Sequence, residues 1–458
     1  MFFFLAISKL KYLHTQANIF LIILASFLAF LILYCHLSAD RRIAGALGDD
    51  VCDGRRIHVV ELPPKFNYGL LDNCRTISKK KNMCVYIENH GFGPKIFNES
   101  TAEDSDGGFE AWSSSWYDTD QFTLELIFHT RMKRYDCLTS NSSLADAIYI
   151  PFYAGLEASR TLRLRNTAER DRVGKEVMKY ISSLSGWRVW EGRDHFFVAG
   201  RIGRDFIRPV NSSYWGNSLM CQPESKHITM LTLEASGRGS HNEVAIPYPT
   251  YFHPSSFDEV RELQRYVVVR PRKHLFAFAG APRRRGSFRD EVISQCKASK
   301  NQCGLISCGN GDDNKECQSP LKVIKLFQNS KFCLQPPGDS PTRRSTFDSI
   351  ISGCIPVFFS LNSGPDQYHW HFPMNYTEYS VYINQESVRI KKVEIAKVLS
   401  SIAEETVEAM RSKVVEMIPR VIYKNLGRGE LDEYEDAFDI AVQGVLKRVD
   451  ENKRNVSS

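Results

Sequence analysis

The segment from Phe332 to Phe359, FCLQPPGDSPTRRSTFDSIISGCIPVFF, constrains the fold more than any other part of the chain. An apolar strand pattern at Phe332–Leu334 leads into a loop with two prolines and a glycine. A helical pattern follows, and Gly353 ends it. Ile355–Phe359 is then apolar enough for a strand that is buried on both faces. This order of elements predicts an α/β fold with parallel strands.

The start of the predicted helix carries groups that suit an anion. Ser340 is a good N-cap and Pro341 suits the first helical position. Arg343 and Arg344 then fall in the first turn, where free N–H groups and the helix dipole attract negative charge. Asp348 lies four residues after Arg344 on the same face and could hold ribose hydroxyls. We therefore expect a nucleotide-diphosphate site; the alternative is an ordinary strand–helix unit with solvated arginines.

The same alternation of strands and helices covers most of the chain. Strands are expected at residues 57–62, 83–87, 147–152, 195–199, 228–233 and 275–279, and helices at 121–134, 162–184, 287–296, 320–328, 394–415 and 437–449. A proline-containing seam at Tyr248–Asp258 separates two halves. We predict an N-terminal doubly wound domain over residues 57–258, a C-terminal one over 259–425, and a helix and tail over 426–458.

The N-terminus is expected to anchor the chain in a membrane. Ile19–Leu37 is almost entirely apolar and without charge. At 1.5 Å per residue this stretch can just span a hydrocarbon core of about 30 Å. Cys35–Ala39 lacks a clean pair of small residues for signal cleavage, which favours an uncleaved anchor over a signal peptide. We predict a cytosolic tail over 1–18, an anchor over 19–37 and a stem over 38–56.

Features beyond this stretch suit an oxidising lumen. Five N-x-S/T sequons follow it, at Asn98, Asn141, Asn211, Asn375 and Asn455. Of the 12 cysteines, eleven lie beyond the predicted anchor. The group Cys296, Cys303, Cys308 and Cys317 is expected to form a cysteine-rich loop. It contains no C-x-x-C pair, so we expect disulfides there rather than zinc. We therefore expect a type II glycoprotein with one membrane anchor and a lumenal domain, an organisation that is common among Golgi enzymes and also occurs in some receptors.

The charge pattern argues against a nucleic-acid partner. The formal net charge of +6 is mild for 458 residues, and the clusters Lys79–Lys81 and Arg283–Arg285 are short. The sequence contains no zinc finger, RNA-binding signature or basic helix with heptads.

Six segments, in order along the chain, carry a resemblance to a known family. They are WYDTDQFTLELIFHTRM (116–132), DAIYIPFYAG (146–155), GRDHFFVAGR (192–201), IPYPTYFHP (246–254), LFAFAGAPR (275–283) and the segment 332–359. The chain resembles the plant exostosin-like glycosyltransferases of family 47, and most of all their xyloglucan galactosyltransferase branch. The resemblance implies a GT-B fold, in which two Rossmann-like domains face a cleft. It places the nucleotide mainly on the C-terminal domain and the acceptor mainly on the N-terminal one.

The same resemblance implies a reaction in cell-wall biosynthesis. The expected activity is inverting transfer of galactose from UDP-galactose to xylosyl side chains of xyloglucan in the Golgi, with no metal or other cofactor required. Galacturonosyl transfer from UDP-galacturonate to the same acceptor is one alternative, and a non-catalytic carbohydrate-binding scaffold is another. Complexes with other glycosyltransferases are compatible with this setting.

Site residues follow from the resemblance together with the chemistry of an inverting transfer. Without a metal, cations must stabilise the leaving diphosphate. The candidate UDP-sugar ligands are Arg283, Ser340, Arg343, Arg344, Ser345 and, on the ribose, Asp348. The candidates for the general base are Asp194, His195 and Glu191, with Glu234 as a further choice. A structural role, in which Asp194 and His195 pair with each other, is the alternative.

Two other patterns need an interpretation. Aromatic residues that could stack on sugar rings or instead belong to the core are Trp187, Trp190, Tyr248, Tyr251 and Phe252. Asp118-Thr119-Asp120 matches the D-x-D that holds manganese in GT-A transferases. Because it precedes a predicted helix, we expect Asp120 to cap that helix rather than to bind a metal.

Overall fold

A computed structural model describes residues 52, 54–96, 114–237, 242–283, 285–308, 317, 319–425 and 434–457. The chain divides into two compact units, Met1–Arg55 and Arg56–Ser458, and the fold described below is that of the second. The predicted anchor at Ile19–Leu37 lies outside the described residues. Within the described ranges, no helix is long and apolar enough to cross a membrane.

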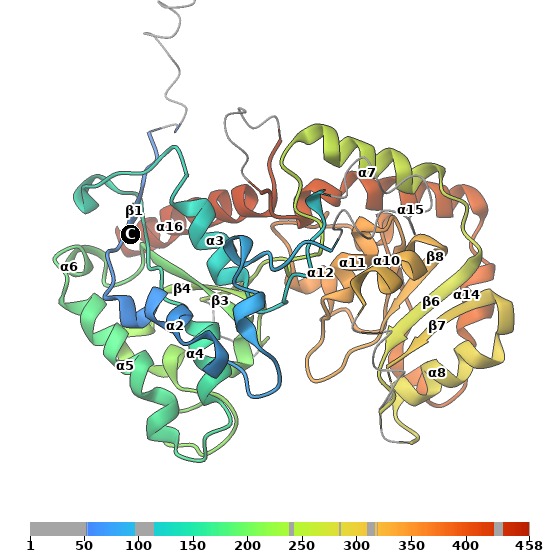
Figure 1. Cartoon of the computed structure of the whole chain (residues 1–458), viewed down its shortest axis with the longest axis horizontal. Helices are drawn as coiled ribbons and strands as arrows, with labels where there is room; N and C mark the ends of the chain where they lie inside the picture. Colours follow the sequence, from blue (N-terminus) through green and yellow to red (C-terminus); the bar gives the residue numbers. More distant parts are fainter. Residues whose placement is uncertain are drawn as a thin grey trace, which may run out of the picture. The chain divides into compact units, whose positions relative to one another are not determined.

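The first sheet is built from five parallel strands in sequence order (Figure 1). They are β1 (Ile57–Val59), β2 (Ala147–Tyr149), β3 (His195–Ile202), β4 (Thr229–Glu234) and β5 (Glu243–Ala245). In the described part of the chain these strands follow one another without the reversal of a dinucleotide-binding sheet.

Helices nevertheless cover both faces of this sheet. On one face, Phe128 of α3 (Leu124–Met132) contacts Tyr149 of β2, with ring centroids 5.7 Å apart. The C-terminal helix α16 (Ala437–Ser457) returns to the same face, where Phe438 lies 4.6 Å from Phe128. On the other face, residues such as Phe197 and Met230 form a separate core with α4 (Ala154–Thr161) and α5 (Thr167–Ser183). The C-terminal helix α16 therefore packs against the sheet of the N-terminal half.

The second sheet has the strand order β10-β9-β8-β6-β7, again entirely parallel. Its strands are β6 (His274–Gly280), β7 (Cys303–Ser307), β8 (Ser330–Gln335), β9 (Ile355–Phe358) and β10 (Val381–Tyr382). On one side of β8 lie β9 and then β10, whereas on its other side lie β6 and then β7. The direction in which the strands follow one another therefore reverses between β6 and β8. Open α/β sheets bind ligands at the carboxyl ends of strands beside such a reversal.

The remaining helices pack around these sheets. They are α2 (Tyr68–Asp72), α6 (Trp187–Trp190), α7 (Phe257–Val269), α8 (Phe288–Ala298), α10 (Pro320–Gln328), α11 (Ser345–Ile351), α12 (Gly364–Gln367), α13 (Gln385–Arg389), α14 (Ile395–Ser400) and α15 (Glu404–Glu416). The single helix predicted over 394–415 is therefore two helices. Ser400 and Ser401 hydroxyls bond back to the carbonyls of Lys397 and Val398, and Ala403 is extended, which ends α14.

Two further local predictions are wrong. Residues 83–87, expected as a strand, contain a 3₁₀ turn at Met83–Val85, because Asn82 caps it and the Cys74–Cys84 disulfide holds the chain back. The cysteine-rich segment, expected as a loop, contains β7. The disulfides Cys296–Cys303 and Cys308–Cys317 confirm the disulfide interpretation, and a further disulfide, Cys333–Cys354, joins β8 to the start of β9.

Candidate functional site

The loop that follows β8 lies where the strand order of the second sheet reverses. The predicted helix begins later than the sequence indicates: α11 starts at Ser345, and the Arg344 side chain at its N-cap makes no capping bond. Ser340 does not cap, because its hydroxyl donates to Glu234 Oε1 at 2.9 Å. Arg343 therefore lies outside the helix, in a loop whose shape is set by a residue of the other sheet.

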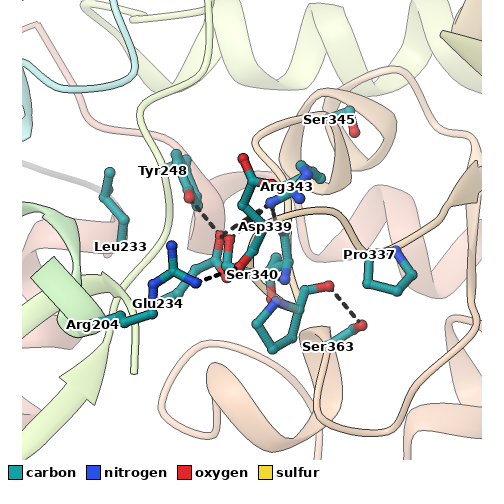
Figure 2. Close-up of polar contacts among 12 residues, drawn as sticks. Arg204, Leu233, Glu234, Tyr248, Pro337, Asp339, Ser340, Arg343, Ser345 and Ser363 are labelled. Atoms are coloured by element: carbon teal, nitrogen blue, oxygen red, sulfur yellow. Dashed lines mark hydrogen bonds and ion pairs between the residues drawn. The ribbon is translucent and has the colours of Figure 1, made fainter. Parts of the chain in front are cut away.

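Glu234, the last residue of β4, holds this loop (Figure 2). Its Oε2 accepts the Thr342 N–H at 3.0 Å, and its Oε1 also accepts the Tyr248 hydroxyl at 2.6 Å. The Glu234 side chain is 1% exposed, and burial raises its pKa above the ordinary value. One carboxylate thus joins the carboxyl edges of the two sheets.

Arginines surround the loop on several sides. Arg343 Nη1 donates to Ser340 Oγ at 2.8 Å and lies 4.0 Å from Glu234 Oε1. Arg289, in the first turn of α8, donates to the Pro337 carbonyl at 3.3 Å. Arg204, just beyond β3, donates to the Asp339 carbonyl at 3.2 Å, and Arg283, just beyond β6, pairs with the Asp339 carboxylate at 2.9 Å.

This arrangement places more positive than negative charge around the loop. Burial, followed by the charges of Arg343 and Arg283, lowers the pKa of Arg289 to about 10. Mutual repulsion among the guanidinium groups is relieved by an anion between them, and arginine suits phosphate through its planar fork of donors.

Gly338 makes room for this arrangement. A Cβ atom built on Gly338 would lie 1.5 Å from Arg343 Nη2. Any larger residue at this position must therefore displace the guanidinium group. The glycine is needed for close approach between the loop and Arg343.

Arg344 and Asp348 lie on a second side of the loop. The Arg344 guanidinium stacks 3.6 Å from the ring centre of Tyr251 and donates to the Thr119 carbonyl of the first half. Arg344 Nε lies 3.7 Å from Asp348 Oδ2. Burial raises the Asp348 pKa to about 6 even though Arg344 opposes that shift. In the described part of the chain, Asp348 Oδ1 is buried and accepts no hydrogen bond.

One of the two D-x-D carboxylates, that of Asp120, contacts a lysine. Asp120 pairs with Lys81, and its Oδ1 accepts the Phe122 N–H at 2.9 Å in the turn before α3. Thr123, not Asp120, occupies the N-cap of α3, so the capping prediction is wrong. Burial, and then the charge of Arg344, lower the pKa of Lys81 to about 8. The described residues contain no cluster of three or more acidic, histidine or cysteine side chains that could hold a metal.

Of the four predicted general bases, the structure brings Glu234 to this loop but not Asp194, His195 or Glu191. Asp194 Oδ1 and His195 Nδ1 lie 2.7 Å apart, and both side chains are buried at the amino end of β3. Trp187 packs against His195 at 5.1 Å between ring centroids. Glu191 follows α6 with a φ of +50° and is exposed beside Arg193. The Asp194–His195 pair is therefore a closed contact at the edge of the sheet opposite to Glu234.

The aromatic candidates mostly pack against protein. Tyr248 bonds to Glu234, Tyr251 lies under Arg344, and Phe252 is buried 5.2 Å from Trp116. Trp190 lies under Lys453. Sequence reasoning missed Arg204, Arg289, Lys81 and Gly338, although Arg204 follows directly after a strand end.

The described sequons are accessible. Asn141, Asn211, Asn375 and Asn455 are exposed, whereas Asn98 lies outside the described residues. Their glycosylation stays a prediction.

Comparisons with known proteins agree on one family. Residues 51–399 match the model of the Exostosin GT47 domain. A probable xyloglucan galactosyltransferase of Arabidopsis thaliana is 46% identical over 88% of this chain and 85% of its own length. The xyloglucan galactosyltransferase MUR3 of the same plant is 43% identical over 89% of this chain and 64% of its own length. A xyloglucan-specific galacturonosyltransferase of that plant is 38% identical over 87% of this chain and 58% of its own length.

Proposed function

Because this chain belongs to the exostosin GT47 family of glycosyltransferases, we propose that it transfers galactose from UDP-galactose to xylosyl side chains of xyloglucan. The observation that carries the proposal is the arginine-lined loop at the carboxyl ends of β6 and β8. Xyloglucan galactosyltransferases among the relatives support the choice of donor and acceptor.

In the proposed mechanism the loop holds the donor diphosphate. Arg343, Arg283 and Arg289 stabilise the charge that grows on the leaving UDP, a role that a divalent metal fills in other transferases. Ser340 and Ser345 support the loop beside the phosphates, because their hydroxyls donate to Glu234 and to Gln335 Oε1 at 2.9 and 2.6 Å. Asp348 binds the ribose. Arg344, held between Tyr251 and the Thr119 carbonyl, positions Asp348. No cofactor is required in this scheme.

Glu234 is proposed as the positioning residue of the donor loop. Its contacts with Ser340, Thr342 and Tyr248 fix the loop conformation between the two sheets. We assign no catalytic step to Asp194, His195 or Glu191, because a base at the amino end of β3 cannot reach an acceptor at the opposite edge.

The finer architecture and the location are part of the same proposal. A GT-B arrangement divides the chain into an acceptor domain at 57–258, a donor domain at 259–425 and a C-terminal segment at 426–458. The apolar stretch at 19–37 would anchor the enzyme in the Golgi membrane, with a tail at 1–18 and a stem at 38–56. The exposed sequons and the disulfides support a lumenal catalytic domain, where complexes with other glycosyltransferases can form.

Galacturonosyl transfer is the second candidate. A cavity of about 400 Å³ adjoins Asp339 of the donor loop. Its lining includes the cations Lys79, Lys80, Lys81, Arg160, Arg163 and Arg201. A carboxylate on the donor sugar would suit such a lining, and one relative is a galacturonosyltransferase.

The test offers the purified full chain a panel of UDP-sugars together with xyloglucan oligosaccharides, with and without EDTA. Galactosyl transfer that persists in EDTA is the expected result. Turnover of UDP-galacturonate alone would select the second candidate. Binding of glycan without turnover of any donor would indicate a non-catalytic scaffold.

A further inference from the structure

Three neighbouring cavities in the described part of the chain share one side chain, Trp215. Their volumes are about 1160, 470 and 400 Å³. The largest is lined in part by Ile207, Pro209 and Met220, and the smallest reaches Asp339 of the donor loop. Compact small-molecule sites usually measure about 300–1,000 Å³. A series of cavities that exceeds this range fits an extended ligand.

Trp215 is both accessible and held in place. It is 45% exposed, and the neighbouring Tyr214 is 80% exposed. The indole Nε1–H donates to Asp205 Oδ1 at 2.6 Å. Asp205 is 1% exposed, and its Oδ2 accepts Arg201 Nε at 2.6 Å. Arg201 in turn stacks on Phe122 at 4.5 Å. A buried carboxylate therefore fixes the orientation of a solvent-facing indole.

The indole lies on the same sheet edge as the proposed donor site. Asp205 belongs to the 3₁₀ turn Gly203–Asp205, which follows the carboxyl end of β3. In the same turn, Arg204 donates to the Asp339 carbonyl at 3.2 Å. Trp215 and Asp339 also line one cavity. A chain that passes over Trp215 can therefore lead toward the donor loop.

The chemistry of this surface suits a sugar chain. The faces of pyranose rings carry C–H groups that pack on aromatic rings, and their edges carry hydroxyls that need polar partners. A rigid aromatic side chain supplies large contact area at little cost in conformational entropy. Around it, the cavity walls offer hydrogen-bonding side chains such as Gln222, Asn242 and Ser159. A purely apolar ligand would cover this polar lining without forming hydrogen bonds to it.

We propose that Trp215 is a stacking platform for the backbone of an extended glycan acceptor, and that Asp205 positions its ring. This inference rests on the proposed function, because it identifies the acceptor subsite of that reaction. It assigns the acceptor to residues that neither bind UDP nor take part in the transfer step.

The test compares Trp215→Ala and Trp215→Phe in the full chain, with xyloglucan oligosaccharides of one and of two repeat units. We expect KM for the longer acceptor to rise about tenfold in Trp215→Ala, the order of one lost aromatic contact. KM for UDP-galactose should stay within about twofold, and Trp215→Phe should recover most of the acceptor affinity. Tyr382→Ala, an exposed aromatic on β10, is the control for surface truncation.

The inference and the proposed function fail in different ways. An unchanged KM for both acceptors in a folded Trp215→Ala variant would overturn the platform. Absence of transfer by the wild type would contradict the proposed function instead. If the wild type shows no transfer, or if Trp215→Ala does not fold, oligosaccharide binding is measured by intrinsic tryptophan fluorescence instead. The two-repeat oligosaccharide should quench the wild type but not Trp215→Phe, and equal quenching would overturn the inference.

Discussion

The two edges of the first sheet contain similar side chains in different settings. At the amino end of β3, Asp194 and His195 are neighbours in the sequence and satisfy each other in a buried pair. At the carboxyl edge, Glu234 bonds to Ser340, 106 positions away on the other half of the chain, with several arginines around the loop. The Asp194–His195 pair satisfies its own hydrogen bond, whereas the arginines around the loop leave positive charge that an anionic ligand can neutralise. In this sheet, the end of the strand at which a side chain lies therefore indicates its role better than its residue type does.

The largest effect is expected from removing Arg343, the cation at the centre of the loop. Arg343→Ala should lower kcat/KM for UDP-galactose by about 10²–10³-fold, as expected for one lost group that stabilises developing charge. Steady-state kinetics measures the effect. Arg389→Ala, which removes an exposed arginine paired with Glu386, should change the rate little. Equal effects of the two variants would contradict the account.

A second variant, Gly338→Ala, keeps every charged residue but displaces the Arg343 guanidinium group. Gly338→Ala should displace the Arg343 guanidinium, because the added methyl would otherwise lie 1.5 Å from Nη2. We expect kcat/KM to fall by about 10–10²-fold, part of the loss expected from removing Arg343. The matched control is Gly186→Ala, since a Cβ there meets its nearest neighbour at 3.5 Å. Retained activity in Gly338→Ala would show that the position of Arg343 is unimportant.

Lys81 offers a test by pH. With its pKa lowered to about 8, Lys81 is charged at pH 7 and neutral at pH 9. If the cations around Arg344 assist UDP binding, KM for UDP-galactose should rise several-fold over this range. The rise should be weaker in Lys81→Met.

The same shift also has a consequence for stability, with a defined sign. Because the folded pKa of Lys81 lies below the ordinary 10.5, its charge destabilises the ligand-free fold below about pH 8. That penalty is relieved as the pH rises from about 8 to 10.5. Because Lys81→Met lacks this titrating group, the melting temperature of the wild type should rise relative to that of the variant between about pH 8 and 10.5, and a constant difference would contradict this reading.

The smallest effect on activity is expected at the opposite edge. Asp194→Asn should leave kcat/KM within about threefold of the wild type while lowering the free energy of unfolding by about 1–3 kcal/mol, because a buried charge-assisted bond is weakened. Chemical denaturation and steady-state kinetics separate the two outcomes. A loss of activity as large as that of Arg343→Ala, without loss of stability, would restore a catalytic role to this edge.

Local patterns predicted the parallel strands, most helices and the presence of disulfides in the cysteine-rich segment, but not which cysteines pair. Predictions from local patterns failed where a residue far away in the sequence binds a group that was expected to make a local hydrogen bond. Ser340 is a good N-cap by sequence, but Glu234 of the other sheet takes its hydroxyl, so α11 begins at Ser345. The order of the strands and the arrival of Arg204 and Arg289 at the loop likewise depend on the folded chain. The family motifs located the loop, whereas only the fold shows which charges surround it.

We propose that UDP binds at the carboxyl edge, in the loop after β8. A crystal structure of the protein with UDP tests it most directly. We expect the diphosphate within hydrogen-bonding distance of Arg343, beside Gly338 and Ser340, with the ribose near Asp348. A diphosphate bound away from this loop, or one held by the Asp194–His195 pair, would contradict it.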